Sequence, residues 1–179
     1  MKLILISFFL LLFTSCIPVR IAPEIKEDKV MVAKKFKRKL PKKYSYIFVD
    51  PKDADEFYNY INTKYQLDHD NVGYNVPVLI NKKEYFLSFH EVEIPTKTIN
   101  LVPLFIDAGL KSKDYDPLFE GSHITRIGNW YLVLTIADSE LNDCLDPSAT
   151  NRKQVLKFLK ETRLEYLATT NYFDALFRK

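Results

Sequence analysis

The sequence predicts an α+β domain with a mainly antiparallel sheet of about five strands and two helices, the longer of them C-terminal. Three observations lead to this fold class. Apolar residues alternate along Trp130–Ala137, which is typical of a strand with one buried face. Two pairs of β-rich segments are each joined by a short turn-forming sequence, as in hairpins. A long segment near the C-terminus carries its apolar residues at helical spacing.

The first expected elements are a strand and a helix. Tyr44–Val49 is rich in aromatic and β-branched residues, and Asp50–Pro51 then favours the end of a strand and the start of a helix. We expect this helix to run over Asp53–Gln66, because its apolar residues recur at a spacing of four. The residues of this stripe are Phe57, Ile61 and Tyr65.

Two hairpins are expected in the middle of the chain. Val76–Ile80 and Glu84–Ile94 flank a polar turn, and Pro77 indicates that the first strand is an edge strand or starts late. His123–Ile127 and Trp130–Ala137 flank a Gly-Asn dipeptide in the same way. Hairpins of this kind make the expected sheet antiparallel.

The remaining segments are one ambiguous stretch and one long helix. Thr98–Leu110 is largely apolar, but Pro103 interrupts it, and Gly109 is a candidate end for a short helix. The long helix is expected over 150–167, with an extension to residue 177 as the alternative. Its apolar residues form one stripe, and lysines occupy the other side.

The N-terminus has the three-part form of a secretory signal. Met1–Lys2 is basic, Leu3–Phe13 is apolar except for Ser7, and Thr14–Ser15–Cys16 is a run of small residues. The apolar run is shorter than the about 20 residues that a membrane-spanning helix needs. These features predict export from the cytoplasm.

The sequence Phe13–Thr14–Ser15–Cys16 resembles the lipobox of bacterial lipoproteins. The resemblance implies that Cys16 is lipidated and becomes the first residue of the mature protein, held on a membrane by two or more acyl chains. The alternatives are an ordinary signal peptide cut nearby and a single N-terminal anchor helix. Ile17–Arg20 lacks both the aspartate that retains enteric lipoproteins in the inner membrane and the acidic cluster of surface-exported ones. The resemblance therefore implies the outer membrane, with the protein facing the periplasm.

After a signal peptide over 1–15, we expect a lipidated cysteine and basic tether over 16–43 and one α+β domain over 44–179. The tether carries ten Lys and Arg against three Asp and Glu, whereas the domain carries 15 against 20. Basic segments beside a lipid anchor are attracted to anionic headgroups. The alternatives are a solvated spacer and an edge strand near Val30–Ala33. The cations expected at the membrane surface are Lys34, Lys35, Lys37, Arg38, Lys39, Lys42 and Lys43.

Composition excludes several classes of protein. Hydrophobic residues make up 47% of the chain, too many for an intrinsically disordered protein. An acidic domain outside the cytoplasm argues against nucleic acid as a partner. Once Cys16 is lipidated, Cys144 has no cysteine to pair with. Three His and four Gly residues provide little for a zinc site or a phosphate-binding loop, so no metal or cofactor is expected.

Few residues are candidates for catalysis. His90–Glu91 begins like a zinc-protease motif, but Ile94 stands where the second His ligand is required. Glu91 and Glu93 share a strand face and are candidates for the carboxylates of a wall or glycan hydrolase, assisted by His90 or His123. The alternative is a pair of acids on a solvated strand end.

Two further candidates have structural explanations. Asp68 and Asp70 match part of a calcium loop whose later ligands are missing, so we expect a plain turn. Cys144 is a candidate nucleophile, but the nearby charges of Asp143 and Asp146 are expected to raise the pKa of its thiol.

The leading hypothesis is a membrane-anchored periplasmic lipoprotein whose non-catalytic α+β domain binds another protein, either an envelope complex or a toxin that it neutralises. The chain has 11 Tyr and 13 Phe residues, and exposed tyrosines often make binding surfaces. The alternatives are the hydrolase and a carrier of lipid or another small ligand, which requires an apolar cavity. The expected binding surface consists of Tyr44, Tyr46, Tyr58 and Tyr60.

Overall fold

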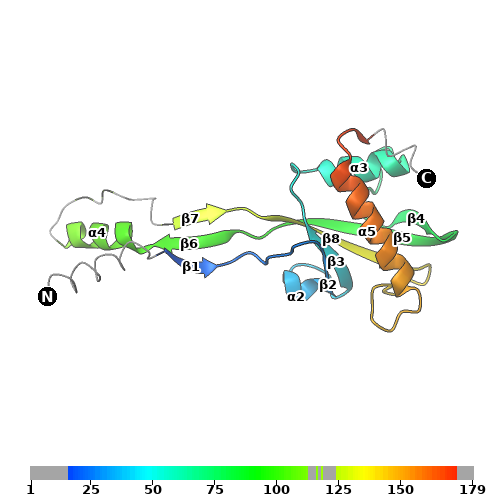
Figure 1. Ribbon diagram of the computed structural model, residues 1–179, viewed down its shortest axis with the longest axis horizontal. Helices are drawn as coiled ribbons and strands as arrows, with labels where there is room; N and C mark the ends of the chain where they lie inside the picture. Colours follow the sequence, from blue (N-terminus) through cyan, green and yellow to red (C-terminus); the bar gives the residue numbers. More distant parts are fainter. Residues whose placement is uncertain (1–15, 113–115, 117, 119–123, 173–179) are drawn as a thin grey trace. The chain divides into compact units, whose positions relative to one another are not determined.

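The computed structural model describes residues 16–112, 116, 118 and 124–172 (Figure 1). The chain divides into two compact units. The small unit consists of Met1–Glu24 and Glu93–Asn129, and the large unit of Ile25–Val92 and Trp130–Lys179. Each unit contains its own sheet. The predicted boundary between residues 43 and 44 falls inside the large unit, and the predicted signal peptide lies outside the described residues.

A five-stranded sheet forms the centre of the large unit. Its strands are β2 (Lys29–Val32), β3 (Tyr44–Val49), β4 (Val76–Ile80), β5 (Lys83–Glu93) and β8 (Trp130–Ala137). Their order is β2-β3-β8-β5-β4, and the pairs β2–β3, β3–β8 and β4–β5 are antiparallel. The predicted α+β class with a mainly antiparallel sheet is confirmed.

The first predicted hairpin is also confirmed. β4 and β5 pair up to Ile80 and Lys83, so the chain turns at Asn81–Lys82. Both turn residues have positive φ, 51° and 65°, as a two-residue type I′ turn requires. Pro77 lies on β4, an outer strand of the sheet, where its missing N–H removes no ladder hydrogen bond on the open side.

The second predicted hairpin is wrong. β7 (Ile124–Ile127) pairs with β6 (Thr96–Asn100) in the small unit, whereas β8 lies between β3 and β5 in the large unit. The dipeptide between β7 and β8 does not fold the chain back on itself. Instead, the carbonyl oxygen of Asn129 accepts a hydrogen bond from the N–H of Ile94 at 2.8 Å. Pairing with distant strands therefore overrides the local turn signal.

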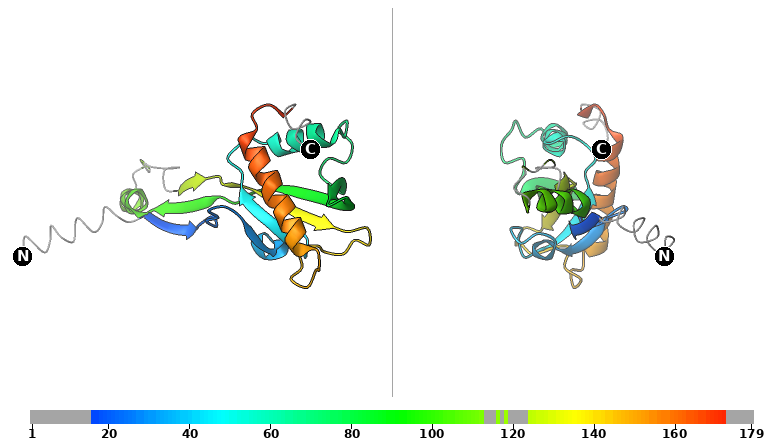
Figure 2. Two further views of the ribbon diagram at one scale, coloured as in Figure 1. Left: turned by 45° about the vertical axis from the view of Figure 1, so that its right-hand side comes forward. Right: turned by 90° about the vertical axis from the view of Figure 1, so that its left-hand side faces the viewer.

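Two helices pack on one face of the large sheet, and they are the two that the sequence predicts (Figures 1 and 2). α3 spans Glu56–Tyr65 and α5 spans Arg152–Ala168. Phe57 of α3 is fully buried, and its ring centroid lies 4.8 Å from that of Phe89 on β5 and 4.9 Å from that of Tyr166 on α5. Both contacts are edge-to-face, the geometry that aromatic rings prefer.

On the opposite face of the large sheet packs a part of the predicted tether that belongs to the large unit. α2 (Ala33–Phe36) lies in this segment, and Phe36 packs edge-to-face on Tyr131 of β8 with 5.1 Å between ring centroids. Ile47 on the neighbouring strand is fully buried. β2 lies at the edge of the sheet, so Val30–Val32 form part of an edge strand.

The small unit contains a three-stranded sheet in the order β1-β6-β7 and the helix α4. β1 spans Cys16–Arg20, and α4 spans Leu101–Lys111 directly after β6. The ambiguous stretch is therefore a strand followed by a helix. Pro103 lies in the first turn of α4, where no intrahelical N–H donor is needed. Gly109 lies inside the helix instead of ending it.

Replacing Phe57 with Ala tests the aromatic core. We expect Phe57→Ala to lower the free energy of unfolding by about 3–5 kcal/mol, because the variant leaves a cavity between β5, α3 and α5. Leu164→Ala on the solvent side of α5, where Leu164 is 59% exposed, is the control. It should change stability by about 0.5 kcal/mol or less. Urea unfolding measures both, and equal losses would contradict this description of the core.

Candidate functional site

The loop that joins β3 to α3, Asp50–Asp55, lines two depressions of the large unit; we call it the Asp50 loop. One depression is a recess of about 10 Å³, room for about one water molecule. Its lining consists of Asp50, Lys52, Asp53, Ala54, Glu91, Trp130 and Tyr131. The other is an open depression lined by Pro51, Lys52, Asp53, Glu56, Thr170 and Tyr172. The two share Lys52 and Asp53, so they form one continuous surface.

Asp50 fixes the start of this loop. Its N–H donates to the carbonyl oxygen of Trp130 at 3.0 Å, and Pro51 then ends the strand because it has no N–H to donate. The Asp50 carboxylate accepts hydrogen bonds from the Tyr166 hydroxyl at 3.0 Å and from the Lys52 N–H at 3.1 Å. Burial raises the pKa of this carboxyl, and those two hydrogen bonds oppose the shift.

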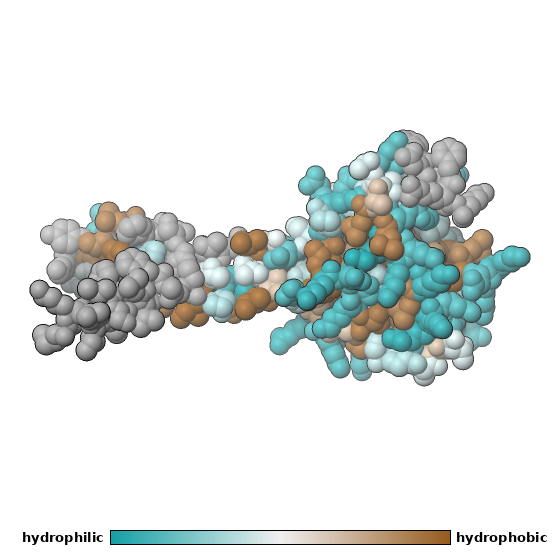
Figure 3. Space-filling view, viewed as in Figure 1, coloured by the Kyte–Doolittle hydropathy of each residue, from teal (hydrophilic) through white to brown (hydrophobic). Residues whose placement is uncertain are grey.

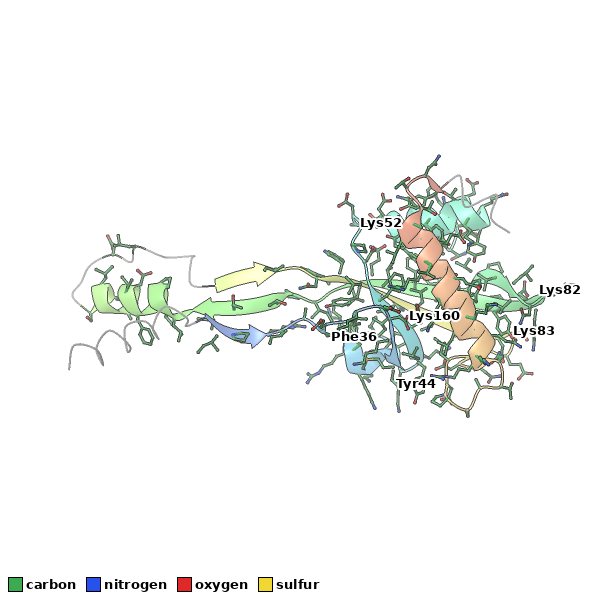
Figure 4. The ribbon with its side chains drawn as sticks, in the orientation of Figure 1. Phe36, Tyr44, Lys52, Lys82, Lys83 and Lys160 are labelled. Carbon is green, nitrogen blue, oxygen red and sulfur yellow. The ribbon has the colours of Figure 1, made fainter. Side chains whose placement is uncertain are left out.

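Lys52 ties the loop to the end of α5 (Figure 4). Its ammonium donates to the carbonyl oxygens of Tyr166 at 2.7 Å and Thr169 at 2.6 Å, and it lies 4.4 Å from the centroid of the Tyr166 ring. The last carbonyls of a helix lack intrahelical donors and attract cations. Burial lowers the pKa of Lys52, whereas the charges of Glu56 and Asp50 raise it.

Glu91 closes the recess from β5. One of its carboxylate oxygens accepts a hydrogen bond from the N–H of Asp55 at 3.3 Å, and the other has no hydrogen-bond partner among the described residues. Asp55 has a positive φ of 66°, which turns its N–H toward Glu91 as α3 begins. Burial raises the pKa of Glu91. The oxygen without a partner is buried, and the recess beside Glu91 has room for about one water molecule.

Trp130 stands at the rim of the recess and is 43% exposed. The sequence predicts it on the buried face of its strand with Leu132, Leu134 and Ile136, and those three residues are buried. Trp130 differs because it is the first residue of β8, beyond the cover of the helices. A large aromatic ring at the start of β8, beside the carboxylates of a loop that is fixed from three elements, can bind a partner's side chain by stacking and by charge.

Two of the four tyrosines expected at a binding surface are buried, which corrects that prediction. Tyr46 and Tyr60 have no exposed surface because both point into the helix-covered core. The Tyr60 ring lies 5.5 Å from that of Tyr166. Tyr44 and Tyr58 are half-buried and pack against the rim of this core. A large number of tyrosines in the sequence is therefore not evidence of an exposed binding surface.

The structure gives no support for a hydrolase site at His90 and Glu91. They are consecutive residues of an extended strand, so their side chains point to opposite faces. The ring of His90 packs edge-on against Tyr74, 5.8 Å between centroids. Glu93 belongs to the small unit, and His123 lies outside the described residues.

Cys144 is a buried free thiol. Its sulfur accepts a hydrogen bond from the Asn151 side chain at 3.4 Å and donates to the carbonyl of Asn142 at 3.6 Å. Burial raises the pKa of the thiol, and the charges of Asp138 and Asp143 raise it further. The thiolate that a nucleophile needs is therefore disfavoured.

The predicted lipidation site and the cations predicted to contact the membrane belong to different units. Cys16 is the first residue of β1 in the small unit. Residues 34–43 comprise the rest of α2 and the loop after it in the large unit, and a hydrogen bond from the Ala33 N–H to the Lys43 carbonyl at 2.9 Å joins the two ends of this segment. Its cations are exposed, apart from the half-buried Lys37. Their contact with a membrane stays a prediction.

Spanning helices and metal clusters are both absent from the part of the chain that the structure describes. No helix there combines the length and the apolar character that crossing a bilayer requires. Nor do three or more His, Cys, Asp or Glu side chains there lie close enough to hold a metal ion.

Asp68 has a positive φ of 50°, as expected for the turn at that position.

No protein-family model, curated protein or solved structure matches this chain. The chemistry of the Asp50 loop therefore has to be inferred from its own residues. Asp50 and Lys52 carry no sequence signal beyond the Asp-Pro turn, because their partners on α5 lie more than a hundred positions away in the chain.

Replacing Asp50 with Asn should change how stability depends on pH. Because the pKa of Asp50 is raised above 3.8, the folded protein holds this proton more tightly than the unfolded chain. Ionisation of the Asp50 carboxyl therefore lowers the free energy of unfolding as pH rises from about 4 through the pKa of this carboxyl in the folded protein. Asp50→Asn keeps an acceptor for Tyr166 but does not titrate, so its stability should decline less over this range.

Urea unfolding at a series of pH values measures this difference. Asp53→Asn, on the exposed part of the same loop, is the matched control. The same pH dependence in Asp50→Asn and in the unaltered protein would show that the carboxyl of Asp50 titrates as it does in the unfolded chain.

Proposed function

We propose that this chain is a membrane-anchored lipoprotein of the cell envelope whose large unit binds another protein through the Asp50 loop and Trp130. The observation that carries the proposal is the half-exposed Trp130 at the rim of an acid-lined depression. Tryptophan is enriched among the residues that contribute most binding energy at protein interfaces. The tyrosine surface expected from the sequence is replaced by this one.

The charge around the Asp50 loop indicates which side chains the partner presents to it. Carboxylates greatly outnumber cations there, so the partner presents Lys or Arg to this surface. Lys52 contributes one positive charge, which the carboxylates around it outweigh. The surrounding acids are Asp50, Asp53, Asp55, Glu56 and Glu91.

The fixed geometry of the loop also favours binding. The hydrogen bonds of Asp50 and Lys52 to α5, and of the Asp55 N–H to Glu91, hold the loop before any partner arrives. Little conformational entropy is then lost on association. Membrane anchoring is supported by the leader of the chain and by the lipobox-like sequence ending at Cys16, and the exposed cations of residues 34–43 add attraction to anionic lipid.

Loss of the Trp130 ring should weaken the complex. A pulldown of the full chain from detergent-solubilised membranes of its own host, quantified by mass spectrometry, identifies the partner. We expect Trp130→Ala to reduce recovery of that partner about tenfold or more. Tyr74→Ala, which removes a more exposed aromatic ring elsewhere on the large unit, is the control. Equal recovery with both variants would rule out the Asp50 loop as the interface.

The anchor is tested by the mass of the mature protein. We expect the purified chain to begin at Cys16 and to carry the added mass of acyl chains. Cys16→Ala should retain residues 1–15 and lack that mass, because the lipid acceptor is gone. An unmodified mature chain that starts at another residue would instead favour the ordinary signal peptide.

A further inference from the structure

The helix α4 of the small unit has its polar and apolar sides reversed. Asp107 faces inward and is only 5% exposed, and its carboxylate accepts a hydrogen bond from the N–H of Leu118 at 2.9 Å. Phe105 is 67% exposed, and its neighbours Leu104 and Ile106 are exposed too. A helix packed on a water-soluble body shows the opposite arrangement. Figure 3 shows hydrophobic surface at α4.

β1 also exposes large apolar side chains to the surface. Ile17, Val19 and Ile21 are all exposed. The strand register shifts between Pro18 and Arg20, so Val19 lies at a bulge between Ile17 and Ile21. Three exposed apolar side chains on an outer strand are unfavourable in water and prone to aggregation.

The strand register brings these two apolar surfaces to the predicted lipid anchor. Cys16 is paired with Asn100 across β1 and β6, and α4 begins at the next residue, Leu101. Paired residues of antiparallel strands have Cα atoms about 4.5–5.5 Å apart. Whatever holds Cys16 at a membrane therefore holds the first turn of α4 there as well.

We propose that the small unit lies in the membrane interface, with the outward side of α4 inserted among the lipid headgroups. The occupant of this apolar surface is thus lipid. The proposal rests on the proposed lipid anchor, since acyl chains on Cys16 keep α4 at the bilayer surface. A helix in this position buries its apolar side to a depth of about 5–10 Å and keeps its polar side toward the protein.

Quenching of tryptophan by brominated lipid measures this insertion. The full lipidated chain carries Trp130→Phe, which removes the one native Trp. Phe105→Trp then reports the outward side of α4, and Leu110→Trp, at a half-buried position of the same helix, is the matched control. The proteins are placed in phosphatidylcholine vesicles with and without lipid dibrominated in the upper acyl chain. Intact mass shows the acylation of each sample, and urea unfolding shows that each is folded.

We expect brominated lipid to reduce the emission of the Phe105→Trp protein about twofold or more and that of the Leu110→Trp protein clearly less. An acylated Phe105→Trp protein whose emission is unquenched would overturn this inference and leave the anchor intact. Blue-shifted emission in that case would assign the surface to a second copy or another protein. Absence of acyl mass would overturn the anchor, and the inference with it.

Discussion

The buried hydrogen bond between Tyr166 and Asp50 is the interaction on which the large unit depends. It joins α5 to the end of β3 and uses the only polar atom of a ring that is otherwise packed against Phe57. The same residue of α5 offers its carbonyl to Lys52, so side chain and backbone of one position hold both ends of the turn. Because the carboxylate is buried, it remains charged only at the expense of stability, and the neighbouring donors offset part of that loss.

The hydrogen bond between Tyr166 and Asp50 makes the Asp50 loop a rigid part of the large unit's surface. The Asp50 loop leads from β3 into α3, and Asp50 and Lys52 bond it to α5. Glu91 on β5 holds its other end by accepting a hydrogen bond from the Asp55 N–H. Trp130 is exposed beside it because β8 begins there, at the residue where the chain enters the large unit. The Trp130 ring and the carboxylates of the fixed loop beside it are the features on which we base the proposed protein recognition.

Local sequence patterns correctly predict the elements whose structure depends on residues close together in the chain. The alternation at Leu132 and Leu134, the helical stripe at Phe57 and Ile61, and the β4–β5 hairpin are all correct because each depends on neighbouring residues. The β7–β8 hairpin is wrong because strands far away in sequence compete for pairing. The contacts of Asp50 with α5 and the exposed apolar side of α4 were unforeseen, since no periodicity records long-range contacts or a partner outside the chain.

The central claim is that a protein partner occupies the Asp50 loop, and photo-crosslinking in the living host tests it most directly. A photoreactive amino acid is placed at Asp53, on the exposed part of the loop, and separately at Lys153, exposed on α5. The account predicts one discrete crosslinked product from position 53, lost when Trp130 is also replaced by Ala, and no such product from position 153. The same products from both positions, or none from position 53, would contradict it.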